Sequence, residues 1–138
     1  MSIITSQLKY QYAGNTTFYF PDLNCKSNES WLLLGNSGSG KTTFLHLIAG
    51  ILKPTDGKIT IENTNLWELS GQKMDAFRGK NIGLMLQTPQ FLKALTLGEN
   101  LLLAQKLAGI KKDKSSTKQL LDQLGLGGYW YKYTFELS

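Results

Sequence analysis

Residues 35–43 read Gly35-Asn36-Ser37-Gly38-Ser39-Gly40-Lys41-Thr42-Thr43, and this stretch decides the fold. It follows a continuous apolar run at residues 31–34, which is typical of a strand covered on both faces. It opens residues 41–52, where apolar side chains recur at helical spacing along one face. A glycine-rich turn between a strand and a helix predicts a P-loop rather than a flexible linker.

The chemistry of this stretch suits the phosphates of a nucleoside triphosphate. Glycines let the backbone approach closely, and successive backbone N–H groups form a nest for anions. The following helix directs its positive end toward the same place. Lys41 is expected to reach the β- and γ-phosphates, and the Thr42 hydroxyl is a hard oxygen ligand suited to Mg²⁺. The motif predicts phosphate binding but does not by itself fix the reaction.

The flanking sequence predicts an α/β fold. Strands are expected at residues 3–12, 16–20, 59–61 and 82–86 because of their apolar runs and alternation. After Gln87 the pattern becomes helical. The two capping-box patterns are Thr96-Leu97-Gly98-Glu99 and Ser116-Thr117-Lys118-Gln119, and Gly125 is the expected end of the second helix.

Length and composition are those of one ordinary domain or a large piece of one. The chain has 138 residues, 41% of them hydrophobic and 18% charged, so it can build a core. No run approaches the roughly 18 apolar residues needed to cross a bilayer. The net charge of +5 lies in residues 71–138, with ten Lys or Arg against five acids, whereas residues 1–70 carry five of each. A nucleic-acid or anionic-lipid surface is one interpretation of this excess. We favour a solvated lysine-rich face, in which Lys111-Lys112-Asp113-Lys114 forms a loop, and we expect no nucleic-acid partner.

Several motifs, in order, resemble the nucleotide-binding subunits of ABC transporters. The P-loop has the family's doubled threonine, and residues 52–59 resemble its proline-containing turn into a strand. Residues 78–87 resemble the strand that ends in the Q-loop glutamine, and residues 95–100 resemble the family's next helix start. The chain stops at Glu136-Leu137-Ser138, which resembles the opening of the L-S-G-G-Q signature. Residues 66–87 look closest to the bacterial subgroup of lipoprotein release and macrolide-type export.

The resemblance implies a P-loop NTPase core, with a parallel sheet plus N-terminal antiparallel strands. The ATP-binding core would occupy residues 1–87, and residues 88–138 would start a helical subdomain. The domain is expected to be incomplete, since the rest of the signature, the Walker B acid pair and the switch histidine are missing. His46, the one histidine, is expected to be a packing or surface residue. The full-length protein is then expected to be an ATPase and the 138-residue chain to be inactive.

The family's functional residues carry over to matching positions. The resemblance implies that the chain binds ATP and Mg²⁺, with Lys41 and Gln87 as the catalytic residues. Thr42 and Gln87 would contact the metal, and Ser138 would contact the γ-phosphate bound by the opposite protomer. The alternatives are a nucleotide-binding module without turnover and a soluble ABC-type ATPase.

In relatives, an aromatic residue upstream of the P-loop stacks on adenine. Tyr12 is the expected residue here, with Tyr10 and Phe18 as the other candidates.

The implied partners are a second ATP-binding subunit, in a head-to-tail dimer, and a transmembrane permease subunit. ATP would be trapped between the P-loop of one subunit and the signature of the other. The permease would meet the surface at residues 87–107. The implied location is cytoplasmic, peripheral on the inner face of the cell membrane.

Overall fold

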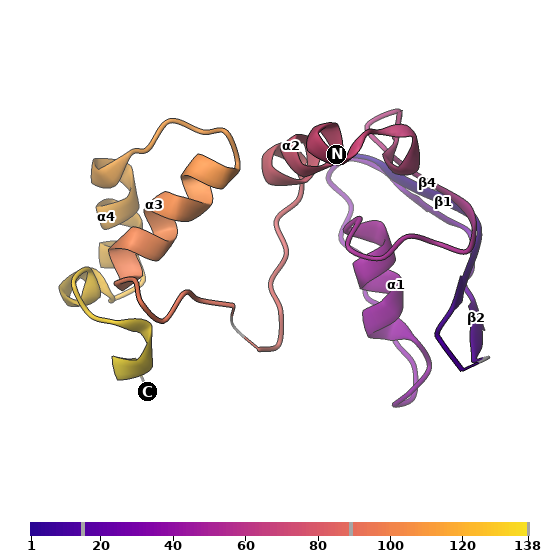
Figure 1. Cartoon of the computed structure of the whole chain (residues 1–138), viewed down its shortest axis with the longest axis horizontal. Coiled ribbons are helices and arrows are strands. Elements are labelled where there is room, and N and C mark those ends of the chain that lie inside the picture. The colour runs from indigo at the N-terminus through magenta and orange to yellow at the C-terminus, as the bar shows by residue number, and fades with distance from the viewer. Residues whose placement is uncertain (15, 89, 138) are drawn as a thin grey trace. The chain divides into compact units, whose positions relative to one another are not determined.

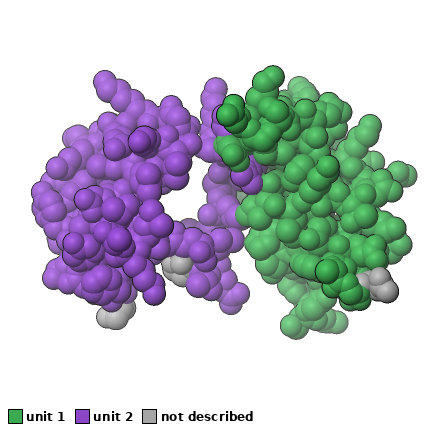
Figure 2. Space-filling model, viewed as in Figure 1, with its two compact units in different colours: residues 1–75 green, residues 76–138 purple. Residues whose placement is uncertain are grey.

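The structure, a computed structural model, describes residues 1–14, 16–88 and 90–137. The chain divides into two compact units, residues 1–75 and 76–138, which Figure 2 colours separately. The expected functional boundary between residues 87 and 88 stays a prediction. Within the described ranges, no helix combines the length and the apolar character needed to span a membrane.

The first unit is built on a five-stranded sheet in which every pairing is antiparallel. The central strand is β1 (Ile3–Gln11), and β4 (Asp56–Ile61) pairs with one of its edges. On the other edge, β2 (Thr17–Tyr19) pairs with the second half of β1 and β3 (Leu23–Cys25) with the first half. The short strand β5 (Thr64–Asn65) extends the sheet beyond β4. The expected N-terminal antiparallel strands are therefore present.

A β-bulge bends β1 between Ser6 and Lys9. Gln7 lies there at φ 50°, and its backbone N–H donates to the Asp22 carboxylate over 2.7 Å. Gly57 in β4 has φ 89°, and a Cβ at this position would collide with the Gln7 carbonyl. The bulge therefore requires glycine at position 57.

The P-loop helix α1 (Lys41–Ile48) lies beside the sheet (Figure 1). It ends earlier than the apolar stripe predicts, because Ala49 caps it and Gly50 turns left-handed at φ 66°. The 3₁₀ turn η1 (Leu66–Glu68) packs against β4. The fully buried side chains of this core are Leu8, Leu47, Ile59, Ile61 and Leu66.

Helix α2 (Gly71–Asn81) runs from the first unit into the second. The second unit then contains α3 (Leu97–Leu107) and α4 (Lys114–Gln123), which lie side by side (Figure 1). Two 3₁₀ turns follow, η2 (Gly127–Tyr129) and η3 (Thr134–Glu136). The buried centre of this unit consists of Leu97, Leu121 and Trp130.

The caps of the two helices test the capping predictions. The box at Thr96 is confirmed, because its hydroxyl accepts the Glu99 N–H while the Glu99 carboxylate accepts the Thr96 N–H. The predicted cap at Ser116 is wrong. The Asp113 carboxylate accepts the Ser116 N–H over 2.9 Å, so α4 begins at Lys114. Gly125, at φ 72°, follows the end of α4 as expected.

The structure corrects the prediction of parallel strands at residues 31–34 and 82–86. Neither segment pairs as a strand in the part of the chain that the structure describes. Leu32 and Leu34 are 80% and 78% exposed, rather than covered on both faces. A continuous apolar run indicates that burial is favourable, but a strand forms only where a neighbouring strand supplies hydrogen bonds.

Candidate nucleotide-binding site

The glycine-rich stretch forms a tight loop that leads directly into α1. Gly38 and Gly40 have φ of 80° and 89°, in the left-handed region that favours glycine. The Ser39 N–H donates to the Asn36 carbonyl over 3.2 Å, which closes the turn. The Gly40 carbonyl accepts the Phe44 N–H over 2.8 Å and starts the helix. The run at residues 31–34 is not part of a strand, but the loop-to-helix geometry predicted from the motif is present.

Lys41 folds back over this loop. Its ammonium group donates to the carbonyl oxygens of Gly35 and Asn36, both at 2.7 Å. No carboxylate among the described residues pairs with it. The positive charge is therefore held at the loop by two neutral acceptors, and an anion with charged oxygens can compete for it.

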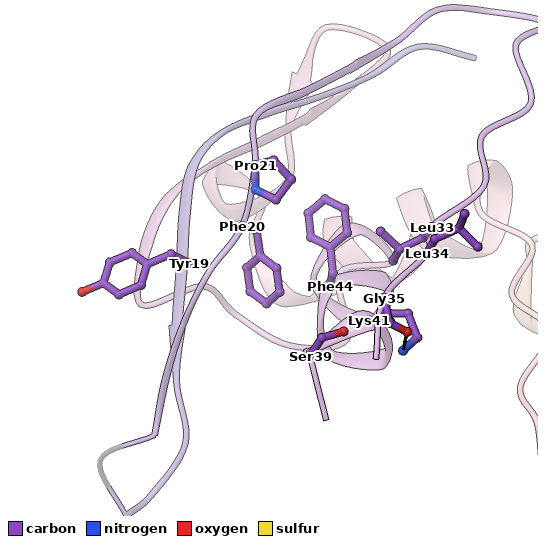
Figure 3. A pocket seen from close by; sticks show the side chains of 10 residues that line it. Tyr19, Phe20, Pro21, Leu33, Leu34, Gly35, Ser39, Lys41 and Phe44 are labelled. Atoms are coloured by element: carbon purple, nitrogen blue, oxygen red, sulfur yellow. Dashed lines mark hydrogen bonds between the residues drawn. The ribbon is translucent and has the colours of Figure 1, made fainter. Parts of the chain in front are cut away.

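Two cavities flank Lys41. The larger, of about 310 Å³, is lined by Phe18, Ser37, Gly38, Gly40, Lys41, Thr42 and Thr43. The smaller, of about 230 Å³, is shown in Figure 3 and is lined by Tyr19, Phe20, Pro21, Leu33, Leu34, Gly35, Ser39, Gly40, Lys41 and Phe44. The larger cavity has the size of a small-molecule site and brings backbone amides, an ammonium and two threonine residues together. These residues fit a Mg²⁺-bound polyphosphate.

The aromatic candidates lie in one connected group beside the loop. The Tyr12 hydroxyl shares a 2.9 Å hydrogen bond with the Thr43 hydroxyl, which fixes Tyr12 to the P-loop helix. The Tyr12 ring meets Tyr10 edge-on at 4.8 Å and Phe18 edge-on at 6.0 Å between centroids. Phe18 lines the larger cavity, whereas Tyr10 and Tyr12 line neither of the two. Which of the three stacks on adenine stays a prediction.

Sequence reasoning missed two residues of the site, Phe20 and Phe44. Their rings stack at 5.1 Å, and Phe20 also stacks on Phe18 at 6.2 Å. We call the rings of Phe18, Phe20 and Phe44 the aromatic row. Gly40 packs against it, because a Cβ there would lie 2.8 Å from the Phe18 ring and 3.2 Å from the Phe20 ring. The apolar spacing of α1 indicates that Phe44 is buried, but nothing in the sequence pairs it with Phe20.

The remaining predicted residues are placed as follows. Gln87 is exposed in the second unit, and its role stays a prediction. Ser138 lies outside the described residues. His46 is half-buried in α1, in line with a packing or surface role. The described residues contain no cluster of His, Cys, Asp or Glu that could hold a metal ion by itself.

The sequence model of the ABC transporter family matches residues 21–138, most of the chain. The chain belongs to the ABC transporter family. The resemblance stated from the motifs is therefore confirmed.

Two relatives illustrate the family. The ABC transporter ATP-binding protein MT1014 of Mycobacterium tuberculosis is 40% identical over 122 residues, which cover 87% of this chain and 47% of that protein. The lipoprotein-releasing system ATP-binding protein LolD of Syntrophotalea carbinolica is 32% identical over 107 residues, which cover 76% of this chain and 47% of that protein. This ABC transporter chain thus spans about half the length of the curated relatives it matches.

A solved structure supports the fold class. The ATP-binding cassette MJ0796, solved as a dimer in a post-hydrolysis state with ADP and Pi, matches at a TM-score of 0.78 and 25% identity. The match covers 99% of this chain and 63% of the cassette. The α/β class is therefore confirmed for this ABC transporter chain.

Proposed function

We propose that this chain supplies the Mg-ATP-binding part of an ABC transporter ATPase. The observation that carries the proposal is the position of the Lys41 ammonium, 2.7 Å from two loop carbonyls and at the boundary of both cavities. The full-length protein would couple ATP binding and hydrolysis to transport across a membrane. Its relatives named as ABC transporter ATP-binding proteins support this assignment.

Four residues of the loop would have separate tasks in binding. Lys41 exchanges two neutral carbonyl acceptors for charged phosphate oxygens, and charge-assisted hydrogen bonds are about twice as strong as neutral ones. The backbone N–H groups around Gly38 and Gly40, together with the start of α1, add positive potential at the same place. The Thr42 hydroxyl supplies one hard oxygen ligand for Mg²⁺. Catalysis on phosphoryl groups is mostly such positioning and charge neutralisation.

Binding without turnover is the activity that we propose for the 138 residues alone. Among the described residues, neither cavity around Lys41 is lined by a carboxylate. Hydrolysis needs a group that orients the attacking water and a carboxylate that completes the metal site. Gln87 is proposed to contact Mg²⁺ and the attacking water in the full-length protein, and the carboxylate is proposed to come from another part of it.

We further propose that the full-length protein pairs head to tail with a second ATP-binding subunit and drives a transmembrane permease subunit. The cassette MJ0796 forms a dimer, which supports the pairing. The proposed location is cytoplasmic, peripheral on the inner face of the membrane.

A phosphate-release assay on the purified chain tests the proposal. We expect no release that depends on Lys41, when the wild type is compared with the Lys41→Ala variant. Lys53→Ala is the matched control, since Lys53 is an exposed lysine of the same unit that lines neither cavity. Release that Lys41→Ala abolishes and Lys53→Ala preserves would overturn the proposal of binding without turnover.

A further inference from the structure

The second unit carries a dense basic surface that the nucleotide site does not use. Five exposed lysines fall within residues 106–118, and we call them the lysine cluster: Lys106, Lys111, Lys112, Lys114 and Lys118. Asp113 is the one acid in this range, and its carboxylate already caps α4 through the Ser116 N–H. None of the five lysines forms an ion pair within the described ranges of the chain.

Gln105 holds the two helices that carry the cluster in a fixed arrangement. Its side-chain carbonyl accepts the Asp113 N–H over 2.8 Å, and its amide donates to the Thr117 hydroxyl over 2.8 Å. These contacts tie the end of α3 to the loop and to the first turn of α4. The lysines at both ends of the loop are thereby kept close together.

Aromatic rings fix two of the ammonium groups. The ammonium groups of Lys114 and Lys118 lie 5.6 and 5.4 Å from the centroid of the buried Trp130 ring, and that of Lys118 lies 6.0 Å from Tyr131. Cations over an aromatic face are attracted to it. Lys114 and Lys118 nevertheless repel each other at i,i+4 spacing, and Lys114 faces the positive end of α4. The arrangement concentrates positive charge where an isolated helix would disfavour it.

Exposed apolar side chains lie next to these charges. Leu107 and Ile110, in the same stretch of chain, are 73% and 56% exposed, and Tyr131 is 72% exposed. Lysines beside exposed aliphatic and tyrosine side chains suit a bilayer interface, where ammonium groups meet lipid phosphates and apolar groups enter the headgroup boundary. A nucleic-acid backbone is polar and charged, so it would not bury the apolar side chains of Leu107 and Ile110.

We propose that the lysine cluster, with Leu107 and Ile110, is a docking surface for the anionic headgroups of a lipid bilayer. The positive charge of the surface is complementary to such a membrane. Residues 1–70 carry no net charge, so they offer no second positive surface to the same headgroups. The surface would orient the protein beneath the membrane. The inference rests on the proposed membrane location, which says which membrane the surface would meet. It does not depend on the nucleotide site.

Sedimentation with lipid vesicles tests this proposal. We expect the chain to sediment with vesicles of phosphatidylglycerol and phosphatidylcholine in equal parts, but not with pure phosphatidylcholine. Binding should be lost in about 1 M salt, where screening acts within about 3 Å. The double variant Lys111→Gln, Lys112→Gln should partition about 25-fold more weakly, at about five-fold per lysine. These two lysines do not contact Trp130 in any described interaction, so the unit keeps its fold.

The matched control is Lys53→Gln, Lys58→Gln, two exposed lysines of the first unit. It changes the net charge equally and should leave vesicle binding unchanged. Ile110→Ser should weaken vesicle binding without changing retention on heparin. An equal loss in the control pair, or retention on duplex DNA without vesicle binding, would overturn the proposal. Lys41→Ala should bind vesicles as the wild type does, so failure of the nucleotide assignment is recognised separately.

Discussion

Alanine at Gly40 should destabilise the first unit more than alanine at Gly38, although both glycines are left-handed. A residue with a Cβ costs about 1–2 kcal/mol in this conformation. At Gly38 the new Cβ would meet nothing within 4 Å, so that cost is the whole effect. At Gly40 the Cβ would lie 2.8 Å from the Phe18 ring and 3.2 Å from the Phe20 ring. Overpacking of this kind adds about 1–3 kcal/mol.

Equilibrium unfolding in urea, followed by far-UV circular dichroism, measures the difference. We expect Gly38→Ala to lower the free energy of unfolding by about 1–2 kcal/mol and Gly40→Ala by about 2–5 kcal/mol. With a slope of about 1–3 kcal/mol/M in urea, the midpoints of the two variants should differ by about 1 M.

A second substitution checks that Phe18 is the cause. Phe18→Leu should destabilise Gly40→Ala less than it destabilises the wild type, because a smaller side chain makes room for the new Cβ. Equal unfolding free energies for Gly38→Ala and Gly40→Ala would refute the packing of Gly40 against the aromatic row.

Three further predictions concern other parts of the chain. Tyr12→Ala should weaken Mg-ATP binding about ten-fold through lost stacking, as titration calorimetry would measure. Tyr12→Phe should keep most of the affinity but lower the free energy of unfolding in urea by about 1 kcal/mol, because it loses the hydrogen bond to Thr43. Gly98→Ala should destabilise the second unit by about 1–3 kcal/mol, because its Cβ would overlap the Trp130 ring, and tryptophan fluorescence would follow the unfolding. Hydrogen bonds from the backbone N–H and the hydroxyl of Thr96 hold the pKa of Glu99 below its ordinary value. The contribution of Glu99 to folding stability is therefore present near neutral pH and is lost as the pH falls below about 4. Glu99→Gln should reduce this loss of stability at acid pH, as unfolding measured across pH would show.

Each of these predictions has a control. Tyr19→Phe should change neither the affinity nor the stability, and an equal effect of Tyr19→Phe and Tyr12→Phe would contradict the bond to Thr43. Gly128→Ala should be mild, since its Cβ would meet nothing within 4 Å. Stability of Glu99→Gln that falls as steeply with acid as the wild type's would contradict the role of this carboxylate.

The parts of the structure that depend on local chemistry could be predicted from the sequence. The P-loop geometry follows from glycines that accept positive φ and from a helix that opens at Lys41. The capping box at Thr96 likewise depends on residues three apart in the chain. Neither feature needs a distant partner to form.

The parts of the structure that depend on contacts between residues distant in the sequence could not be predicted from it. Helix α2 was missed because its apolar residues form no stripe, and Met74 is its one buried residue in the described structure. The strand β3 has only three residues, and β1 supplies its partners. The runs at residues 31–34 and 82–86 are predicted as strands from their continuous apolar pattern, which does not reveal whether a neighbouring strand is available. The stack of Phe20 on Phe44 is likewise a long-range contact that no local pattern encodes.

The most direct test of the central claim is a nuclear magnetic resonance titration of the ¹⁵N-labelled chain with Mg-ATP. We expect the largest amide shifts to fall on residues 37–43 and Lys41→Ala to remove them. The Lys111→Gln, Lys112→Gln variant should leave them unchanged. Shifts confined to residues 106–118, or shifts at residues 37–43 that persist in Lys41→Ala, would contradict the assignment of this loop as the nucleotide site.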